Sequence, residues 1–367
     1  GHFSEGRSWL EAFAQNKQEE EGLQQTQAHA YIIIGVLAAE QGDFAQAERQ
    51  TEVGLHLYQE VDDQTGICSA LVTLGSLAYL CDRYEQAEEW YHQALTLCRA
   101  IGDRVHIPGV LSNLAVIATA QGRYHEAQLF LEEGLTYPSE IGDHYGIAVC
   151  LVNLSNLFHK EGKFAQATAT AKEALAHAEQ TGNRRTIASA LENVGKAACD
   201  QGNYQEAIVA LERGRQLYQE LCDGLGNASV LRHLGDVSRE QGDWQQAEAY
   251  YRESIEMSQQ AGTAMGIAKC LAGWAKVLLA RGQAVRSACF ASKAAAMYGE
   301  AGIAPQANIM VRLEQTTRAI QQALGDEAFQ AAWERGKMLS LADLQDGNVE
   351  ISLVAPPEMN GQQPQHD

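Results

Sequence analysis

Residues 74–95, LGSLAYLCDRYEQAEEWYHQAL, contain two helical patterns joined by a short polar break. Apolar and small residues recur at spacings of three and four on both sides of this break, as in Tyr84, Ala87, Tyr91 and Ala94. This spacing places them along one face of an amphipathic helix. The stretch therefore predicts a hairpin of two antiparallel helices that pack through their apolar faces.

The same hairpin recurs every forty residues without insertion or deletion. Glycine commonly stands two residues before the aromatic position, where it can end a helix in the left-handed conformation and the next polar residue can begin another. Only the seventh row departs from the aromatic position, at Ala284. We expect seven full hairpins over residues 25–303, stacked into an all-α, right-handed superhelical solenoid. The recurring aromatic residues are Phe44, Tyr84, Tyr124, Phe164, Tyr204 and Trp244, and each is followed three residues later by alanine.

Small residues also recur at matching places in the hairpins. Gly75 occupies such a place in a first helix, and Gly54, Gly134 and Gly214 do so in second helices. Because a missing side chain lets two helix backbones approach, we expect the paired helices to touch closely at these glycines.

The two ends of the chain depart from the repeat. Residues 1–24 read as the second helix of a truncated hairpin followed by a linker, so we expect a fragment of a longer protein, with upstream domains outside it and a surface open to self-association. Residues 304–345 predict C-terminal capping helices. Residues 346–367 hold three of the six prolines together with Gly, Gln and Asn, which predicts a disordered tail.

Charge and composition narrow the classes of partner. The chain carries 27 Lys and Arg residues against 47 Asp and Glu residues, a formal net charge of −20. Such a chain repels nucleic-acid backbones and anionic membrane surfaces, so we expect it to bind neither. No segment is long and apolar enough to span a bilayer, and no secretory signal opens the chain, which predicts a cytoplasmic protein. The eight cysteines form no CxxC pair, and we expect them to be reduced core residues.

The spacing of residues within each repeat is similar to that of a known family. The spacing from Leu74 and Gly75 to Ala78, Ala87, Tyr91 and Ala94 resembles the tetratricopeptide repeat, with units of 40 residues in place of roughly 34. The opening GHFSEGRSWLEAF and residues 328–344 are similar to the repeat regions that end bacterial signal-transduction NTPases and large transcription regulators. The resemblance implies a sensor region, although no phosphate-binding GxxxxGK[ST] motif occurs here.

One face of the first helices is a candidate binding surface. In the family that face lines the inner wall of the superhelix, and in successive rows one of its positions holds Thr73, Asn113, Asn153, Asn193 and His233. Asparagine is unfavourable inside a helix, but its amide offers a donor and an acceptor that can pair with an extended peptide main chain. The alternative is that these amides bond to one another or to water and stabilise repeat stacking.

We call the asparagines at this repeat position the asparagine column. Positively charged residues are concentrated around it in an otherwise acidic chain, and an acidic or phosphorylated ligand would suit them. The alternative is a mixed, solvated charge face. Tyr79 and His159 stand at the groove edge as candidate specificity contacts. The remaining candidates for the ligand-binding groove are Asn156, Lys196, Arg232, Asp236, Lys269 and Lys276, with Lys160 and Arg239 nearby.

No residue pattern supports a catalytic or metal site. HExxH, GxSxG and paired acid–base sets are all missing, so we expect neither catalysis nor a cofactor or metal. The sequence favours a protein- or peptide-binding sensor or scaffold of a larger cytoplasmic regulator, which holds an extended ligand in its inner groove. The alternatives are a domain that senses a small-molecule inducer and the self-assembly surface of a signalling NTPase.

Overall fold

The computed structural model describes residues 23–81, 83–300 and 308–345. Helices that follow one another along the chain pair as antiparallel hairpins, and each hairpin also packs on the next. The described residues contain no strand, which confirms the predicted all-α solenoid. The hairpins are α2 (Leu23–Glu40) with α3 (Phe44–Glu60), α4 (Gln64–Leu80) with α5 (Tyr84–Ile101), α6 (Ile107–Ala120) with α7 (Tyr124–Ile141), α8 (His144–Glu161) with α9 (Phe164–Thr181), α10 (Arg184–Asp200) with α11 (Tyr204–Glu220), α12 (Gly224–Glu240) with α13 (Trp244–Gln260), and α14 (Ala264–Ala280) with α15 (Ala284–Glu300).

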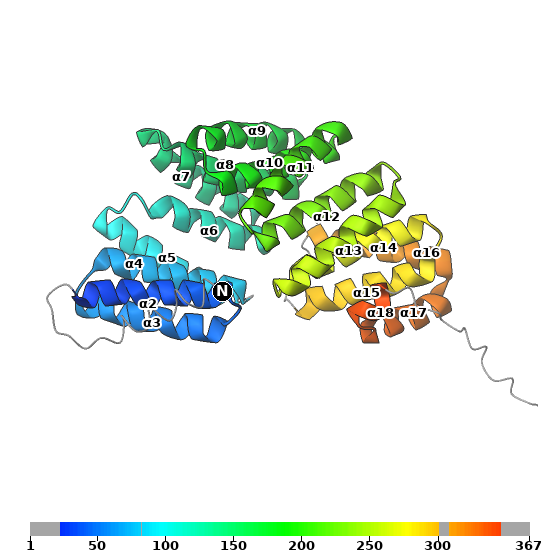
Figure 1. Ribbon diagram of the computed structural model, residues 1–367, viewed down its shortest axis with the longest axis horizontal. Coiled ribbons are helices and arrows are strands. Elements are labelled where there is room, and N and C mark those ends of the chain that lie inside the picture. Colours follow the sequence, from blue (N-terminus) through cyan, green and yellow to red (C-terminus); the bar gives the residue numbers. More distant parts are fainter. Residues whose placement is uncertain (1–22, 82, 301–307, 346–367) are drawn as a thin grey trace, which may run out of the picture.

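The hairpins follow one another around an arc that begins at α2 and α3 and ends at α14 and α15 (Figure 1). The even-numbered helices α4 to α14 also contact one another in succession, so they form one continuous layer. The odd-numbered helices of the hairpins form the other layer.

Turn chemistry follows the predicted pattern. Gly142 ends α7 with a φ of 68°, in the left-handed region that favours glycine. Asp143 then caps α8, where its carboxylate accepts a hydrogen bond from the backbone N–H of Tyr145. Two adjacent residues therefore end one helix and begin the next.

The recurring glycines differ in how closely their neighbours approach. A Cβ at Gly75 would lie 2.7 Å from Cε1 of Tyr91, so this position has no room for a side chain. A Cβ at Gly134 would lie 3.5 Å from the nearest atom, Cβ of Leu111, which is ordinary van der Waals contact. The expected close approach is therefore present at Gly75 and missing at Gly134.

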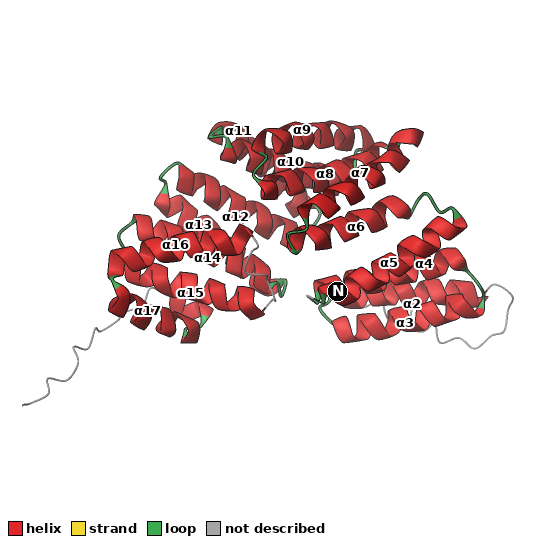
Figure 2. Cartoon of the chain, turned by 180° about the vertical axis from the view of Figure 1, so that it is seen from behind, coloured by secondary structure: helices red, strands yellow, loops and turns green. Residues whose placement is uncertain are grey.

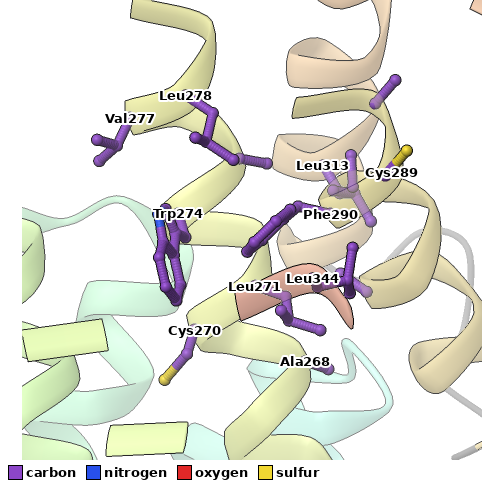
Figure 3. Packing of buried hydrophobic residues seen from close by; sticks show 14 of the residues in the cluster. Ala268, Cys270, Leu271, Trp274, Val277, Leu278, Cys289, Phe290, Leu313 and Leu344 are labelled. Carbon is purple, nitrogen blue, oxygen red and sulfur yellow. The ribbon is translucent and has the colours of Figure 1, made fainter. Parts of the chain in front are cut away.

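In the described residues 308–345, three helices follow the last hairpin: α16 (Asn308–Leu324), α17 (Asp326–Met338) and α18 (Leu341–Gln345). α17 packs on α15, while α16 contacts α15 and α14 and lies against α14 when the molecule is seen from behind (Figure 2). Leu313 of α16 and Leu344 of α18 join a buried cluster around Trp274 and Phe290, whose ring centroids are 5.0 Å apart (Figure 3). This core holds α16 beside the end of the solenoid.

A disulfide corrects the prediction for the cysteines. Cys68 of α4 and Cys98 of α5 are bonded, with a Cα–Cα distance of 6.4 Å, whereas the other six cysteines are free. The prediction of eight reduced cysteines is wrong for this pair. Thirty residues separate the two along the chain, and only the packing of α4 on α5 brings them together.

Residues 1–22 of the predicted truncated hairpin and linker, and the predicted disordered tail at residues 346–367, lie outside the described residues. Within the described ranges, none of the helices combines the length and the apolar character that a bilayer crossing requires.

Candidate functional site

Side chains that come mainly from the even-numbered helices line a cavity of about 530 Å³, within the range of about 300 to 1,000 Å³ typical of ligand pockets. α8, α10, α12 and α14 each contribute several side chains at the same repeat positions, and α16 adds residues from outside the repeats. Ten of the predicted groove residues line this cavity: Tyr79, Asn156, His159, Asn193, Lys196, Arg232, His233, Asp236, Lys269 and Lys276.

Only part of the asparagine column lines this cavity. Asn113 and Asn153 are half-buried and do not line it. Asn193 does line it, but the side chain is only 4% exposed and its Nδ2 donates a hydrogen bond to the carbonyl of Val152, 2.9 Å away. This bond joins α10 to α8, so Asn193 contributes to the stacking of neighbouring hairpins.

Glu192 is a cavity residue that sequence reasoning missed. Its Oε1 accepts a hydrogen bond of 2.5 Å from Ser229 Oγ and lies 3.4 Å from His233 Nε2. Burial raises its pKa, but the contacts with His233 and Ser229 and the charge of Arg232 outweigh burial and lower the pKa to about 2. Glu192 occupies the same repeat position as Arg232, so the forty-residue register could have identified it.

The second acidic group, Asp236, is held by the chain's own donors. Tyr251 Oη donates to Asp236 Oδ1 at 2.8 Å, and Arg232 Nη1 lies 3.3 Å from Oδ2. Arg239 approaches the same carboxylate at 3.5 Å. Burial raises the pKa of Asp236, but the charges of Arg232 and Arg239 lower it overall. Both cavity carboxylates are therefore ionised at pH 7 and engaged within the protein.

The histidines of the cavity differ in their surroundings. Burial and the neighbouring Arg232 lower the pKa of His233 to about 4, so this ring is neutral at pH 7. His159 Nε2 lies 2.6 Å from Asp200 Oδ2. Burial lowers the pKa of His159, although Asp200 opposes this effect.

The cationic side chains of the cavity outnumber its carboxylates. Lys196 Nζ donates to Asn156 Oδ1 at 2.5 Å, and burial lowers its pKa to about 8. Lys269 reaches the solvent within the cavity, and burial together with neighbouring positive charges lowers its pKa to about 7. We call the six lining cations the cationic cluster; its members are Lys160, Lys196, Arg232, Lys269, Lys276 and Arg312.

Arg312 could not have been found from the repeats, because α16 lies outside them. It lines the cavity together with Leu313 and Thr316. Its charge acts on groups of two separate helices, because it contributes to lowering the pKa of His159 on α8 and of Lys276 on α14. α16 therefore carries a positive group into the space between the inner helices.

Tyrosines line the part of the cavity formed by the earlier helices. Tyr79 of α4, Tyr84 of α5 and Tyr124 of α7 all face it, and the rings of Tyr79 and Tyr84 pack edge to face with centroids 5.8 Å apart. The cavity thus has an aromatic part at α4 to α7 and a cationic part at α8 to α16.

One group of three metal-ligating side chains comes together among the described residues, at Cys68, Cys98 and Asp103. The two sulfur atoms are joined in the disulfide and do not offer the thiolates that a metal requires. The group also lies outside the residues that line the cavity.

Comparison with protein families settles the class of repeat. A tetratricopeptide-repeat model matches residues 66–140, 107–180, 186–260 and 227–300, and a second model of the same repeat matches residues 28–52. The chain belongs to the tetratricopeptide repeat family. The predicted resemblance is confirmed, and the repeat boundaries of the matches agree with the forty-residue register.

Two solved structures of this fold are complexes. A Rap protein complexed with competence and sporulation factor is 17% identical, with a TM-score of 0.64 over 84% of this chain and 80% of that chain. NprR in complex with its cognate peptide NprX is 16% identical, with a TM-score of 0.59 over 90% and 92% of the two chains.

A signal transduction ATPase with numerous domains (STAND) from Pyrococcus horikoshii, which has a tetratricopeptide repeat sensor, is 13% identical with a TM-score of 0.52. The match covers 94% of this chain and 53% of the ATPase, so this chain spans about half of that protein's length. The agreement is one of fold. No curated protein matches the sequence.

Proposed function

We propose that this chain is a non-catalytic sensor region that holds an extended peptide or protein segment in the cavity, as part of a larger cytoplasmic regulator. The observation that carries the proposal is the cavity itself, to which α8, α10, α12 and α14 present polar side chains at equivalent repeat positions. The Rap protein and NprR support it, because both share this fold and both have structures with a bound peptide or factor.

Repeat geometry suits an extended ligand. Packed helices stand ~9 to 10 Å apart, and an extended peptide rises about 3.3 Å per residue. Each inner helix would therefore meet roughly every third residue of the ligand. We propose Asn156 and Asn193 as main-chain contacts; because Nδ2 of Asn193 bonds to Val152, its side-chain oxygen is the group that would accept a peptide N–H.

A blocked cavity tests this function. Ala272 lines the cavity on α14, so Ala272→Trp would fill part of it, whereas Ala249→Trp on the exposed side of α13 is a matched control. Affinity selection from a random heptapeptide library, with mass-spectrometric detection, should recover peptides with the wild type and with Ala249→Trp. Ala272→Trp should lose them while its circular dichroism spectrum stays unchanged. Recovery of the same peptides by the folded Ala272→Trp variant would refute binding in this cavity.

The tyrosine-lined part of the cavity favours a second function, the sensing of a small-molecule inducer. Tyr79, Tyr84 and Tyr124 offer ring faces and hydroxyl groups to one space, a combination that suits a small polar ligand such as an oligosaccharide. Native mass spectrometry of the protein purified from its source would distinguish the two functions. A bound compound of low mass that Ala272→Trp does not retain, together with no recovered heptapeptide, would establish the inducer.

A further inference from the structure

The junction between α5 and α6 gathers side chains that can bind a metal, and none of them lines the cavity. A carboxylate oxygen of Asp103 and the sulfur atoms of Cys68 and Cys98 all lie within 4.8 Å of one another. Nδ1 of His106 is 2.6 Å from Oδ2 of Asp103. α4, α5 and the turn into α6 therefore bring two sulfurs, a carboxylate and an imidazole together.

These side chains differ in their access to water. Cys68 and Cys98 are fully buried, and the side chain of Asp103 is only 10% exposed. The side chain of His106 is 36% exposed and lies at the surface of the group. A metal ion could therefore enter past the imidazole and reach ligands that are shielded from water.

The residues at this junction depart from the packing that the repeat uses elsewhere. Three repeats later, Tyr218 packs on Gly226, where a Cβ would lie 2.3 Å from the tyrosine ring. Cys98 and His106 hold the equivalent positions at this junction. Two side chains with metal-binding atoms thus replace a contact between a ring and a glycine, so apolar packing alone does not account for them.

Reduction makes the two sulfurs available to a metal. A dithiol reductant breaks the S–S bond by supplying two electrons and two protons; the protein then carries two thiols, and the reductant becomes a disulfide. In the cytoplasm, where the proposed function places the chain, cysteines are kept reduced, and grouped cysteines are more often metal-binding or catalytic. A metal then binds both sulfurs as thiolates and releases their two protons to water.

The ligand types and their spacing suit zinc. Zn²⁺ takes four ligands in a tetrahedral arrangement, from thiolate, imidazole and carboxylate groups. Two thiolates on one zinc ion, each with a bond of about 2.3 Å, stand ~3.8 Å apart. The Cα atoms of Cys68 and Cys98 are 6.4 Å apart, a distance from which side-chain rotation permits that separation. Between Asp103 and His106, the zinc ion would take the place of the proton that the two side chains share.

We propose that the reduced protein binds Zn²⁺ through Cys68, Cys98 and Asp103, and that His106 completes the tetrahedral site. The disulfide and the zinc ion connect different parts of the chain. The disulfide joins α4 to α5, within one hairpin, whereas zinc also joins the turn that leads into α6, in the next hairpin.

This junction is a place where an added connection matters. Among the described residues, α5 and α6 make the least extensive contact between successive hairpins. The tyrosine-lined part of the cavity spans the same junction, since Tyr84 belongs to the earlier hairpin and Tyr124 to the later one. Zinc would therefore strengthen the stack where its own packing is weakest and hold the two tyrosines in a fixed relation.

Cobalt binding by the full chain tests the site, because Co²⁺ bound tetrahedrally to thiolates has intense visible absorption bands that disappear when Zn²⁺ displaces it. Protein reduced with a phosphine and freed of metal by a chelator should show these bands with a single equivalent of Co²⁺, and the oxidised protein should not. Cys98→Ser should abolish the bands. Cys150→Ala is the matched control and should keep them, because Cys150 is a free buried cysteine whose position holds Ala70 and Ala190 in other repeats.

A second pair of variants leaves both cysteines in place. Asp103→Asn keeps a side chain that can cap α6 but should weaken Zn²⁺ binding at least tenfold in competition with a chromophoric chelator, and His106→Ala should weaken it by about tenfold or more. Asp143→Asn is the matched control, because Asp143 caps α8 and the position equivalent to Cys98 holds Pro138 there. Its zinc affinity should equal that of the wild type.

Hydrogen exchange should show the added connection, because Zn²⁺ should slow exchange in the first turn of α6 in the reduced wild type and not in Asp103→Asn. Missing thiolate bands in the reduced wild type, bands that persist in Cys98→Ser, or equal zinc affinity of Asp103→Asn and the wild type would each overturn the zinc site. If Cys98→Ser does not fold, the comparison of Asp103→Asn with the wild type decides. These results are independent of peptide recovery, which tests the proposed function by itself.

Discussion

Substitution by alanine should lower local stability at Gly336 and raise it at Gly134. Both lie inside helices, where replacing glycine with alanine gains about 1 kcal/mol of helix propensity. A Cβ at Gly336 of α17 would lie 2.6 Å from the Cα and the carbonyl oxygen of Cys289 on α15. Main-chain atoms cannot rotate away, so α17 would have to move by about 1 Å to reach ordinary carbon contact distances of ~3.5 to 4.0 Å.

Whether each substitution stabilises or destabilises depends on the cost of overpacking compared with the gain in helix propensity. Overpacking a well-packed interface costs about 1 to 3 kcal/mol, and a clash with backbone belongs at the upper end of this range. Gly336→Ala should therefore weaken the docking of α17 by about 1 to 2 kcal/mol after the helix gain is subtracted. At Gly134 the nearest atom would be 3.5 Å away, so Gly134→Ala should stabilise its hairpin by about 1 kcal/mol.

Hydrogen exchange measures both effects locally, which suits a solenoid whose hairpins contact mainly their neighbours. Amides of α17 should exchange about tenfold faster in Gly336→Ala, since about 1.4 kcal/mol is a factor of ten, while those of α11 keep their rates. Amides of α7 should exchange more slowly in Gly134→Ala. Unchanged exchange of α17 in the first variant, or faster exchange of α7 in the second, would refute the reasoning.

Three further outcomes test other features of the fold. Lys269 has a folded-state pKa of about 7, below its ordinary value, so between about pH 7 and 10 the unfolded chain binds a proton that the folded chain does not. Lys269→Met should therefore be more stable than the wild type in urea near pH 7, with the difference shrinking as the pH rises toward 10. Asn193→Ala should cost about 1 kcal/mol through loss of its bond to Val152, measured by exchange of α10; unchanged rates would contradict a stacking role. Reduction of the Cys68–Cys98 disulfide should lower stability by about 3 kcal/mol, and a Cys68→Ser variant should not respond to the reductant.

The sequence pattern predicted the helix hairpins, because the helices and turns of a hairpin are determined by residues that are close together in the sequence. Apolar residues at spacings of three and four define the buried face of a helix, and pairs such as Gly142 and Asp143 mark where helices end and begin. The forty-residue register also identified the inner face, since residues at equivalent positions occupy equivalent places in a regular stack. Most of the predicted groove residues lie together for this reason.

The tertiary structure decided which groups meet across larger separations. How the helices pack and how the stack curves determine three contacts. These are the disulfide between Cys68 and Cys98, the hydrogen bond of Ser229 to Glu192, and the position of Arg312 in the lining of the cavity. Periodicity states which face of a helix is buried, but not the distance between two side chains on different helices. Arg312 is the clearest case, because α16 follows no repeat and only its packing against α14 and α15 places its charge among the lysines.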